Sequence, residues 1–251
     1  MSPVVLRCEN LRKSYGGVRA LSDVSITFPP AGCIAIIGPN GAGKSTLLDI
    51  ITGFTCPDSG SCFLGNDGIS SLRPDQIVGR GITRTFQQVR LISRLSVIEN
   101  VMLALPNQTG ESLWRALIGT GLHSEEAQNF RRSRALLDNV ELTEYADTPA
   151  GALSYGQQKL LSVTCCIAAS GAILLLDEPF AGVNPALAEQ ISQLIRAIAH
   201  EEKLVIFVEH DMEMVRRTAD EVMVMDSGKL VARGAPEELL NRREILEAYL
   251  T

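Results

Sequence analysis

The segment Gly38–Thr46, which reads GPNGAGKST, constrains this chain more than any other stretch. It fits the pattern G-x-x-x-x-G-K-[ST], a phosphate-binding loop that requires a strand before it and a helix after it. The apolar run Cys33–Ile37 precedes the loop and is typical of a buried parallel strand. Residues Ser45–Ile51 predict a helix that Gly53 can end. This context disfavours the alternative, a glycine-rich turn beside a surface lysine.

The glycines and the helix start suit this loop to phosphate groups. Gly41 and Gly43 lack a Cβ atom, so the backbone can turn tightly and aim its N–H groups inward. The helix N-terminus adds positive potential at the same place. Lys44 would reach the β- and γ-phosphates of a nucleotide, and the Ser45 hydroxyl would ligate Mg²⁺. The predicted nucleotide contacts in the loop are Gly38, Pro39, Asn40, Gly41, Ala42, Gly43, Lys44, Ser45 and Thr46.

Length and charge narrow the class of protein. The 251 residues, 45% of them hydrophobic, suffice for one large domain or two small ones. The net charge of −6 argues against a surface that coats nucleic acid. No apolar stretch reaches the roughly 20 residues of a membrane span, and the N-terminus MSPVVLRCEN lacks the features of a signal peptide. We therefore expect a soluble, cytosolic chain without nucleic-acid partners.

The six cysteines form no C-x-x-C pair. Metal or redox chemistry is the alternative reading, but the spacing favours buried, reduced thiols.

Patterns typical of strands occupy both ends of the chain. Gly16-Gly17 ends the first predicted strand, Pro29-Pro30 ends the second, and Gly65–Gly68 is a predicted turn between two later ones. Asp226–Lys229 is a turn of hairpin type. The predicted strands are Val4–Tyr15, Val24–Phe28, Cys33–Ile37, Ser61–Leu64, Ile82–Phe86, Ala172–Leu176, Leu204–Val208, Glu221–Met225 and Leu230–Ala232.

Helical patterns dominate the middle of the chain, to about Ala150. Ser96–Glu99 is a capping-box pattern that opens an apolar helix to Leu105. Residues 106–121 read as a loop, and Ser124–Val140 reads as a charged amphipathic helix. Because strands alternate with helices on both sides, we expect an α/β core with this stretch as an insertion.

Helices also occur in the last third. Asn184 can cap a helix that has Pro185 at its first position and runs to about Glu202. Two short helices are predicted to finish the chain.

Two carboxylates follow the apolar run that ends at Leu176. Asp177 leaves a buried strand beside a phosphate loop, where it can hold the shell of a Mg²⁺ ion. Glu178 is then placed to polarise an attacking water as a general base. The alternative for an isolated Asp-Glu pair is a solvated strand end, but the presence of the phosphate loop favours the catalytic reading.

The segment Leu153–Gln157, which reads LSYGQ, resembles the LSGGQ signature of ATP-binding cassette (ABC) ATPases. In that family a serine hydroxyl and a glycine amide at a helix start grip the γ-phosphate of ATP bound to the other subunit of a head-to-tail dimer. The resemblance implies ATP contacts at Ser154, Tyr155, Gly156 and Gln157, although Tyr155 departs from the consensus glycine. An ordinary helix cap is the alternative.

Other residues match family positions by the same resemblance. Tyr15 matches the aromatic residue that stacks on adenine, with a core tyrosine as the alternative. Gln87, in TFQ, matches the glutamine that touches Mg²⁺ and the water, with a surface glutamine as the alternative. His210, in VEHDM, matches the switch histidine at the γ-phosphate, with a structural or exposed histidine as the alternative. Asn184 stands where many relatives have aspartate.

The resemblance covers nearly the whole chain and implies a RecA-like P-loop NTPase core of residues 1–88 and 160–251. An antiparallel β subdomain and an inserted helical subdomain at about residues 89–159 complete the expected fold. One departure follows the signature, where Cys165 or Cys166 replaces the arginine of an Ala-Arg pair.

The resemblance also implies a transport function. LSYGQ is similar to a signature found in ATP-binding subunits of branched-chain amino acid importers. Such a subunit works at the cytoplasmic face of the membrane with permease subunits, with a second copy or related ATPase, and indirectly with a solute-binding protein. Docking is expected through Arg94 and the 96–105 helix, unless these are ordinary polar faces. Urea, amides and organic acids are alternative cargoes, and a soluble ABC ATPase without a transport role is the alternative class.

Overall fold

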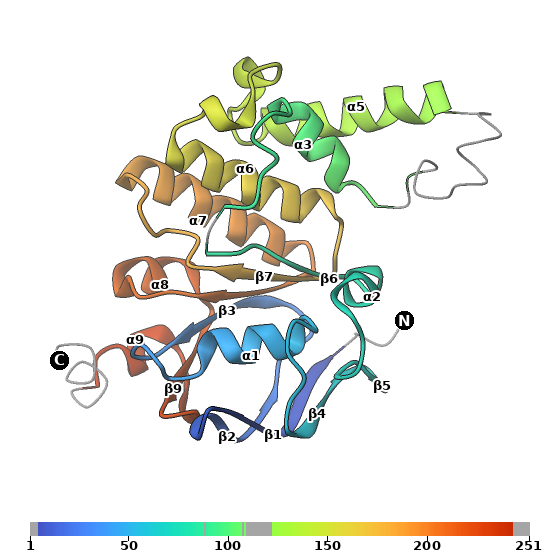
Figure 1. Cartoon of the computed structure of the whole chain (residues 1–251). Coiled ribbons are helices and arrows are strands. Elements are labelled where there is room, and N and C mark those ends of the chain that lie inside the picture. The colour runs from blue at the N-terminus through green and yellow to red at the C-terminus, as the bar shows by residue number, and fades with distance from the viewer. Residues whose placement is uncertain (1–4, 88, 107, 109–121, 243–251) are drawn as a thin grey trace. The chain divides into compact units, whose positions relative to one another are not determined.

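The computed structural model describes residues 5–87, 89–106, 108 and 122–242 (Figure 1). The chain divides into two compact units. The first comprises the described residues up to Arg84, Ala172–Ala181 and those from Ile191 onward. The second comprises the described residues of Thr85–Gly171 and Gly182–Gln190.

A six-stranded sheet forms the centre of the first unit, in the order β10-β9-β3-β8-β7-β6. Neighbouring strands from β9 to β6 pair in parallel, and β10 pairs with β9 in the antiparallel sense. Every residue of β7 and β8 is buried, as the uninterrupted apolar runs predict. The strands are β3 (Gly32–Ile37), β6 (Ile82–Arg84), β7 (Ile173–Asp177), β8 (Leu204–Val208), β9 (Glu221–Asp226) and β10 (Lys229–Gly234).

A second, antiparallel sheet of the same unit has the order β2-β1-β4-β5, as expected for the β subdomain. The predicted strand Val24–Phe28 is too short, because pairing with β1 already starts at Val18. The predicted turn Gly65–Gly68 is wrong in its second half, where Asp67 and Gly68 pair with β4. The strands are β1 (Leu6–Tyr15), β2 (Val18–Thr27), β4 (Ser59–Leu64) and β5 (Asp67–Gly68).

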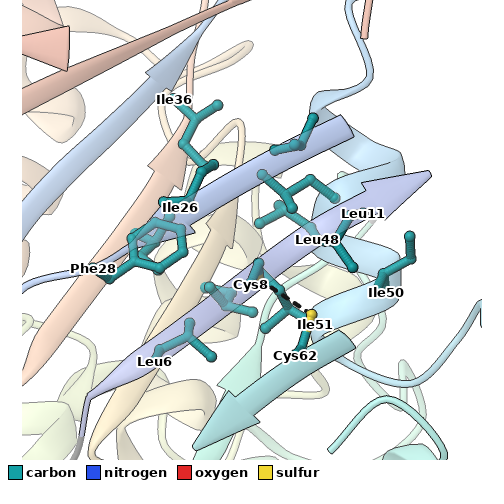
Figure 2. Close-up of a cluster of buried hydrophobic side chains, with 14 of the residues drawn as sticks. Leu6, Cys8, Leu11, Ile26, Phe28, Ile36, Leu48, Ile50, Ile51 and Cys62 are labelled. Atoms are coloured by element: carbon teal, nitrogen blue, oxygen red, sulfur yellow. Dashed lines mark hydrogen bonds between the residues drawn. The ribbon is translucent and has the colours of Figure 1, made fainter. Parts of the chain in front are cut away.

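Helix α1 (Lys44–Ile51) lies between these two sheets and fills the core of the first unit (Figures 1 and 2). Leu47, Leu48, Ile50 and Ile51 are buried, so the helix is apolar on more than one face, as an element covered from both sides must be. Gly53, with φ +72°, ends it as predicted. The position of the phosphate loop is therefore fixed by a rigid, fully packed element.

The cysteines are free thiols, as predicted, but not all of them are buried. Cys8 on β1 faces Cys62 on β4, and their sulfur atoms lie 3.1 Å apart inside the core (Figure 2). Cys165 is partly exposed, and Cys56, on the loop before β4, is exposed, so the prediction of a buried thiol is wrong for Cys56.

Two helices of the first unit are absent from the sequence prediction: α2 (Pro74–Gly79) and α8 (Met212–Thr218). α7 (Pro185–His200) begins at the predicted proline, and the Asn184 side chain accepts a hydrogen bond from Leu187 N–H at 2.9 Å, which confirms the cap. α9 (Pro236–Leu239) is one of the two short helices expected at the end. Residues 243–251, where the second was expected, lie outside the described residues.

The second unit is helical in its described part. α3 (Val97–Ala104) opens with the predicted capping box between Ser96 and Glu99 and contacts α5 (Leu122–Asp138) and α6 (Tyr155–Ala168). Two short 3₁₀ turns, η2 (Thr143–Tyr145) and η3 (Ala150–Ala152), precede α6. The loop predicted for residues 106–121 falls almost wholly outside the described residues. Among the described helices, none has the length and hydropathy that a membrane crossing requires.

Candidate functional site

The phosphate loop connects β3 to α1 and needs glycine at two of its positions. Gly43 is the N-cap of α1 with φ +98°, and a Cβ atom there would lie 2.3 Å from the Ala20 carbonyl oxygen. Gly38 has φ +152°, and a Cβ atom there would lie 2.0 Å from the Met225 oxygen. A side chain at either position would collide with backbone, so the loop conformation depends on these glycines.

The start of α1 leaves its backbone donors without a side-chain cap. No side chain of the N-cap residue accepts from the first turn, and this turn carries no acidic residue. The N–H groups of a first helical turn have no partner within the helix. Together with the helix dipole, they suit this end of α1 to an anionic ligand such as a phosphate.

Lys44 folds back over the loop from the first position of α1. Its Nζ donates to the carbonyl oxygens of Gly38 at 2.5 Å and Pro39 at 2.9 Å, and the residue is 6% exposed. Burial lowers the pKa of Lys44, and the negative charges of Glu178 and Asp177 act in the opposite direction. The ammonium group of Lys44 and the two carboxylates therefore belong to one electrostatic site.

Asp177 is the last residue of β7 and is buried beside Arg84 of β6. Arg84 donates through one nitrogen to Asp177 Oδ2 at 3.0 Å and through another to Asp49 Oδ1 of α1 at 2.6 Å. The Asp177 side chain is 8% exposed, so this cation compensates a charge that water cannot reach well. Sequence reasoning missed Arg84, although an arginine within a buried strand is itself a signal for a nearby carboxylate.

Glu178 and His210 meet at the ends of β7 and β8. The Nε2 atom of His210 lies 3.1 Å from Oε1 of Glu178, within hydrogen-bond distance. The Glu178 side chain is 18% exposed and that of His210 is 39% exposed, so both are accessible to water. Glu178 has φ +49°, a left-handed backbone conformation that is uncommon outside glycine and occurs often at functional sites.

Glu209, next to His210, is a buried carboxylate that sequence reasoning also missed. It is 2% exposed, and its oxygens accept hydrogen bonds from Phe180 N–H at 2.8 Å and His210 N–H at 2.9 Å. Burial raises the pKa of Glu209, while the backbone hydrogen bonds partly oppose this rise. A glutamate after the apolar run Leu204–Val208 was the available signal.

Two other predicted residues, Tyr15 and Gln87, come from other segments of the chain. Tyr15 ends β1 and is 48% exposed, with Lys13 Nζ 5.4 Å from the centre of its ring, so the alternative of a core tyrosine is wrong. Gln87 belongs to the second unit and is exposed. Its matched role at Mg²⁺ and the water stays a prediction.

The signature segment starts α6 in the second unit. Ser154 is the N-cap: its Oγ accepts from Gln157 N–H at 3.3 Å, and Gln157 Oε1 accepts from Ser154 N–H at 3.0 Å. The Tyr155 ring packs against Gly182, where a Cβ atom would lie 2.9 Å from Cε1 of the ring. A Cβ atom at Gly156 would lie 2.4 Å from Leu187 Cδ2. The departure at Tyr155 thus has a packing partner that is itself a glycine.

The cysteines of α6 pack as ordinary side chains. Cys166 is buried, and burial raises the pKa of Cys165 to about 12. In the part of the chain that the structure describes, no three or more His, Cys, Asp or Glu side chains form a metal-binding group.

Comparison with known proteins agrees with the geometry. The family model described as ABC transporter matches residues 21–181. The high-affinity branched-chain amino acid transport ATP-binding protein LivG of Escherichia coli K12 is 34% identical over 252 aligned positions, covering 100% of this chain and 99% of LivG. The corresponding protein BraF of Pseudomonas aeruginosa is 33% identical with the same coverage.

Solved structures give the same result. A nucleotide-free ATP-binding cassette from an ABC transporter superposes with a TM-score of 0.85 at 31% identity, covering 99% of both chains. The ADP conformation of an ATP-binding cassette of an ABC transporter superposes with a TM-score of 0.83 at 30% identity, covering 98% of both chains. With the phosphate loop, the two carboxylates and the signature segment all present, this chain belongs to the ABC transporter family as a nucleotide-binding subunit that hydrolyses ATP.

Proposed function

We propose that the chain powers the uptake of branched-chain amino acids through separate membrane subunits. The observation that carries the ATPase part is the convergence of Lys44, Asp177, Glu178 and His210 around the uncapped start of α1. The cargo is inferred from LivG and BraF, whose names assign them to branched-chain amino acid transport.

In this proposal ATP is bound by backbone N–H groups of the phosphate loop, by the Lys44 ammonium group and by the Tyr15 ring. Residues 38–46 surround the phosphates with N–H groups, and the Lys44 ammonium leaves the Gly38 and Pro39 carbonyls to contact the β- and γ-phosphates. Tyr15 stacks on the adenine ring. Because Tyr15 is exposed at the end of its strand, its ring is available to a base without any rearrangement of the core.

The residues present fit one Mg²⁺ ion. Ser45 and Asp177 would hold it, directly or through water, since Mg²⁺ in phosphate sites takes one or two protein ligands besides the phosphates. When bound, the ion neutralises charge that develops on the phosphate oxygens. The Ser45 side chain is exposed at the start of α1, in position for such a ligand.

Hydrolysis needs a base and a group that orients it. Glu178 takes a proton from the attacking water, and its partly exposed carboxylate is accessible for this step. His210 holds the Glu178 carboxylate through the 3.1 Å contact and, with ATP present, faces the γ-phosphate.

The signature segment contributes to a second nucleotide in this scheme. Ser154 Oγ already accepts from Gln157 N–H, and its own proton remains available to donate to a γ-phosphate on the opposite subunit. The active form is therefore a head-to-tail pair of this chain, or of this chain with a related ATPase. The signature segment would lie at the end of the helical subdomain, whose predicted range of about residues 89–159 stays a prediction.

A groove on the second unit suits the membrane partner. It has a volume of about 520 Å³ between α3 and α5, and its lining includes four apolar and three acidic side chains. A short amphipathic helix of a permease, with basic residues on its rim, would fit this surface at the cytoplasmic face of the membrane. The lining residues are Ser96, Ile98, Glu99, Met102, Glu126, Ala127, Phe130 and Asp147.

Reconstitution tests the proposal. The tagged chain is purified from detergent-solubilised membranes, and the complex is placed in proteoliposomes with its solute-binding protein. We expect copurified membrane-spanning subunits and ATP-dependent accumulation of labelled leucine, with no accumulation by the Glu178→Gln variant. Uptake of urea, an amide or an organic acid instead of leucine would show that the proposed cargo is wrong. If the purified chain hydrolyses ATP but no membrane subunit copurifies with it, the transport function is contradicted.

A further inference from the structure

We propose that Glu209 is a positioning residue for ATP hydrolysis, because its buried carboxylate joins the segment after β7 to the segment after β8 and thereby fixes His210 against Glu178. This inference rests on the proposed function, in which Glu178 and His210 act on the attacking water. Glu209 itself contacts backbone N–H groups of both segments and has no predicted contact with ATP.

The contacts of Glu209 span two separate segments. Oε1 accepts from Phe180 N–H at 2.8 Å, two residues after Glu178, and Oε2 accepts from His210 N–H at 2.9 Å. We call this pair of hydrogen bonds the Glu209 bridge. One carboxylate therefore holds the backbone on which each of the two interacting side chains depends.

The bridge lies where the sheet stops. The pairing of β7 with β8 ends at Asp177 and Val208, and Glu178 N–H donates to the Val208 oxygen at 3.0 Å as the last backbone link. Beyond it, the two segments leave the sheet ladder. The Glu209 bridge continues the connection by one side chain, so the relative position of the two segments no longer depends on the sheet alone.

The bridge is buried among packed side chains. Glu209 is 2% exposed and Phe180 is 5% exposed, with the Phe180 ring packed edge-on against Phe207 at a centroid distance of 6.0 Å. A buried carboxylate is costly unless hydrogen bonds compensate it. Its retention here is explained by the backbone N–H groups of Phe180, His210 and, at 3.5 Å, Asp211, which a hydrophobic side chain would leave unsatisfied.

The chemistry of the bridge demands a carboxylate. Both oxygens of Glu209 accept: Oε1 from Phe180 N–H, and Oε2 from His210 N–H with a longer contact of 3.5 Å from Asp211 N–H. Glutamine has the same shape but only one acceptor oxygen, and its NH₂ group would face an N–H donor. Aspartate keeps two acceptors but is one methylene shorter, so it cannot reach both donors without backbone movement. Glu209→Gln therefore breaks one half of the bridge with little change in volume.

Steady-state kinetics of the full chain test this inference. For Glu209→Gln we expect kcat to fall by up to about 100-fold, the scale of a small misplacement of catalytic groups, with the KM for ATP unchanged. The matched control is Thr218→Val, which removes the buried 2.7 Å hydrogen bond to Ser192 in the same unit. The control should lower Tm without lowering kcat. An unchanged kcat in Glu209→Gln would overturn the proposal.

A double-variant comparison separates positioning from plain structural damage. If Glu209 acts through His210, adding Glu209→Gln to His210→Ala should lower kcat no further. A kcat of the double variant that falls by the product of the two single-variant losses would overturn the proposal. Should Glu209→Gln not fold, Glu209→Asp takes its place, with a lower kcat and an unchanged KM expected and a wild-type kcat contradicting it. A normal kcat in His210→Ala would refute the role of His210 itself. A lower kcat in His210→Ala together with an unchanged kcat in Glu209→Gln would refute this inference but not the proposed function.

Discussion

Helices α1 and α6 both begin at segments matched to nucleotide binding, yet they treat their first-turn N–H groups differently. The N-cap of α1 is Gly43, which offers no side-chain acceptor. The N-cap of α6 is Ser154, which forms a complete capping box with Gln157. The first helix leaves its donors for a ligand, whereas the second satisfies one of them, Gln157 N–H, with its own N-cap and keeps a hydroxyl proton to offer.

This difference shows that a helix start can bind phosphate in two ways. At α1 the ligand itself takes the place of the cap, so ATP binding and local stability should be coupled. At α6 the cap is built in, so the segment is formed before any nucleotide arrives. We infer that the α1 region sets ATP affinity and that the α6 region senses ATP held by another subunit.

Within the α1 and α6 regions, the largest effect is expected from Lys44→Ala. This change removes the cation of the α1 region, so hydrolysis should fall by at least about 10²–10³-fold, the scale for losing one preorganised charge-stabilising donor, and ATP affinity should weaken as well. Phosphate release and equilibrium binding of a fluorescent ATP analogue measure the two effects. Lys203→Ala, which alters a surface lysine paired with Glu201, is the control. Near-normal turnover in Lys44→Ala would contradict the assignment of the phosphate loop.

A smaller effect is expected at the adenine end of the same region. Tyr15→Ala should weaken ATP binding by about 1–3 kcal/mol, by analogy with base stacking on aromatic rings, while maximal hydrolysis is retained. Tyr15→Phe keeps the ring and should bind ATP as the parent does. The comparison is made by isothermal titration calorimetry. An alanine variant with unchanged affinity would assign Tyr15 to a role outside nucleotide binding.

The smallest effect concerns the stability of the α6 region. Ser154→Ala should lower the free energy of unfolding by about 1 kcal/mol, because the N-cap acceptor is lost. Ser154→Asn keeps an acceptor and should retain that stability, although it lacks the hydroxyl. Both variants should reduce hydrolysis by the assembled dimer. If both variants hydrolyse ATP at the wild-type rate, the segment is an ordinary helix cap and its predicted contact with ATP is wrong.

Much of the fold follows from local sequence. The buried runs that become β7 and β8, the Ser96 capping box and the Asn184–Pro185 helix start are all local signals, and each is present in the structure. Helix α2 was missed because its N-cap is Arg73, which is not a usual capping residue. Only the reverse bond is present there: Gln76 Oε1 accepts from Arg73 N–H at 3.0 Å. The early part of β2 was missed because its alternating polar residues are ordered by pairing with β1.

The residues of the candidate site also differ in how far local sequence predicts them. Its glycines, Lys44, the Asp177-Glu178 pair and the signature form contiguous motifs, so local sequence is enough to predict them. Arg84 and Glu209 were missed because their partners are remote: Asp177 lies 93 positions from Arg84, and Phe180 lies 29 positions from Glu209. Such long-range pairs depend on the order of strands in the sheet, which no local pattern encodes.

The central claim is that binding at α1 and hydrolysis at the ends of β7 and β8 are separable. Glu178→Gln tests it directly, since glutamine keeps the size and hydrogen bonding of glutamate but cannot act as a base. ATP affinity and single-turnover hydrolysis are measured on the same preparation. We predict ATP binding equal to that of the parent chain and hydrolysis slower by about 10²–10⁴-fold, the usual contribution of a general base. Parent-level hydrolysis by Glu178→Gln would contradict the account.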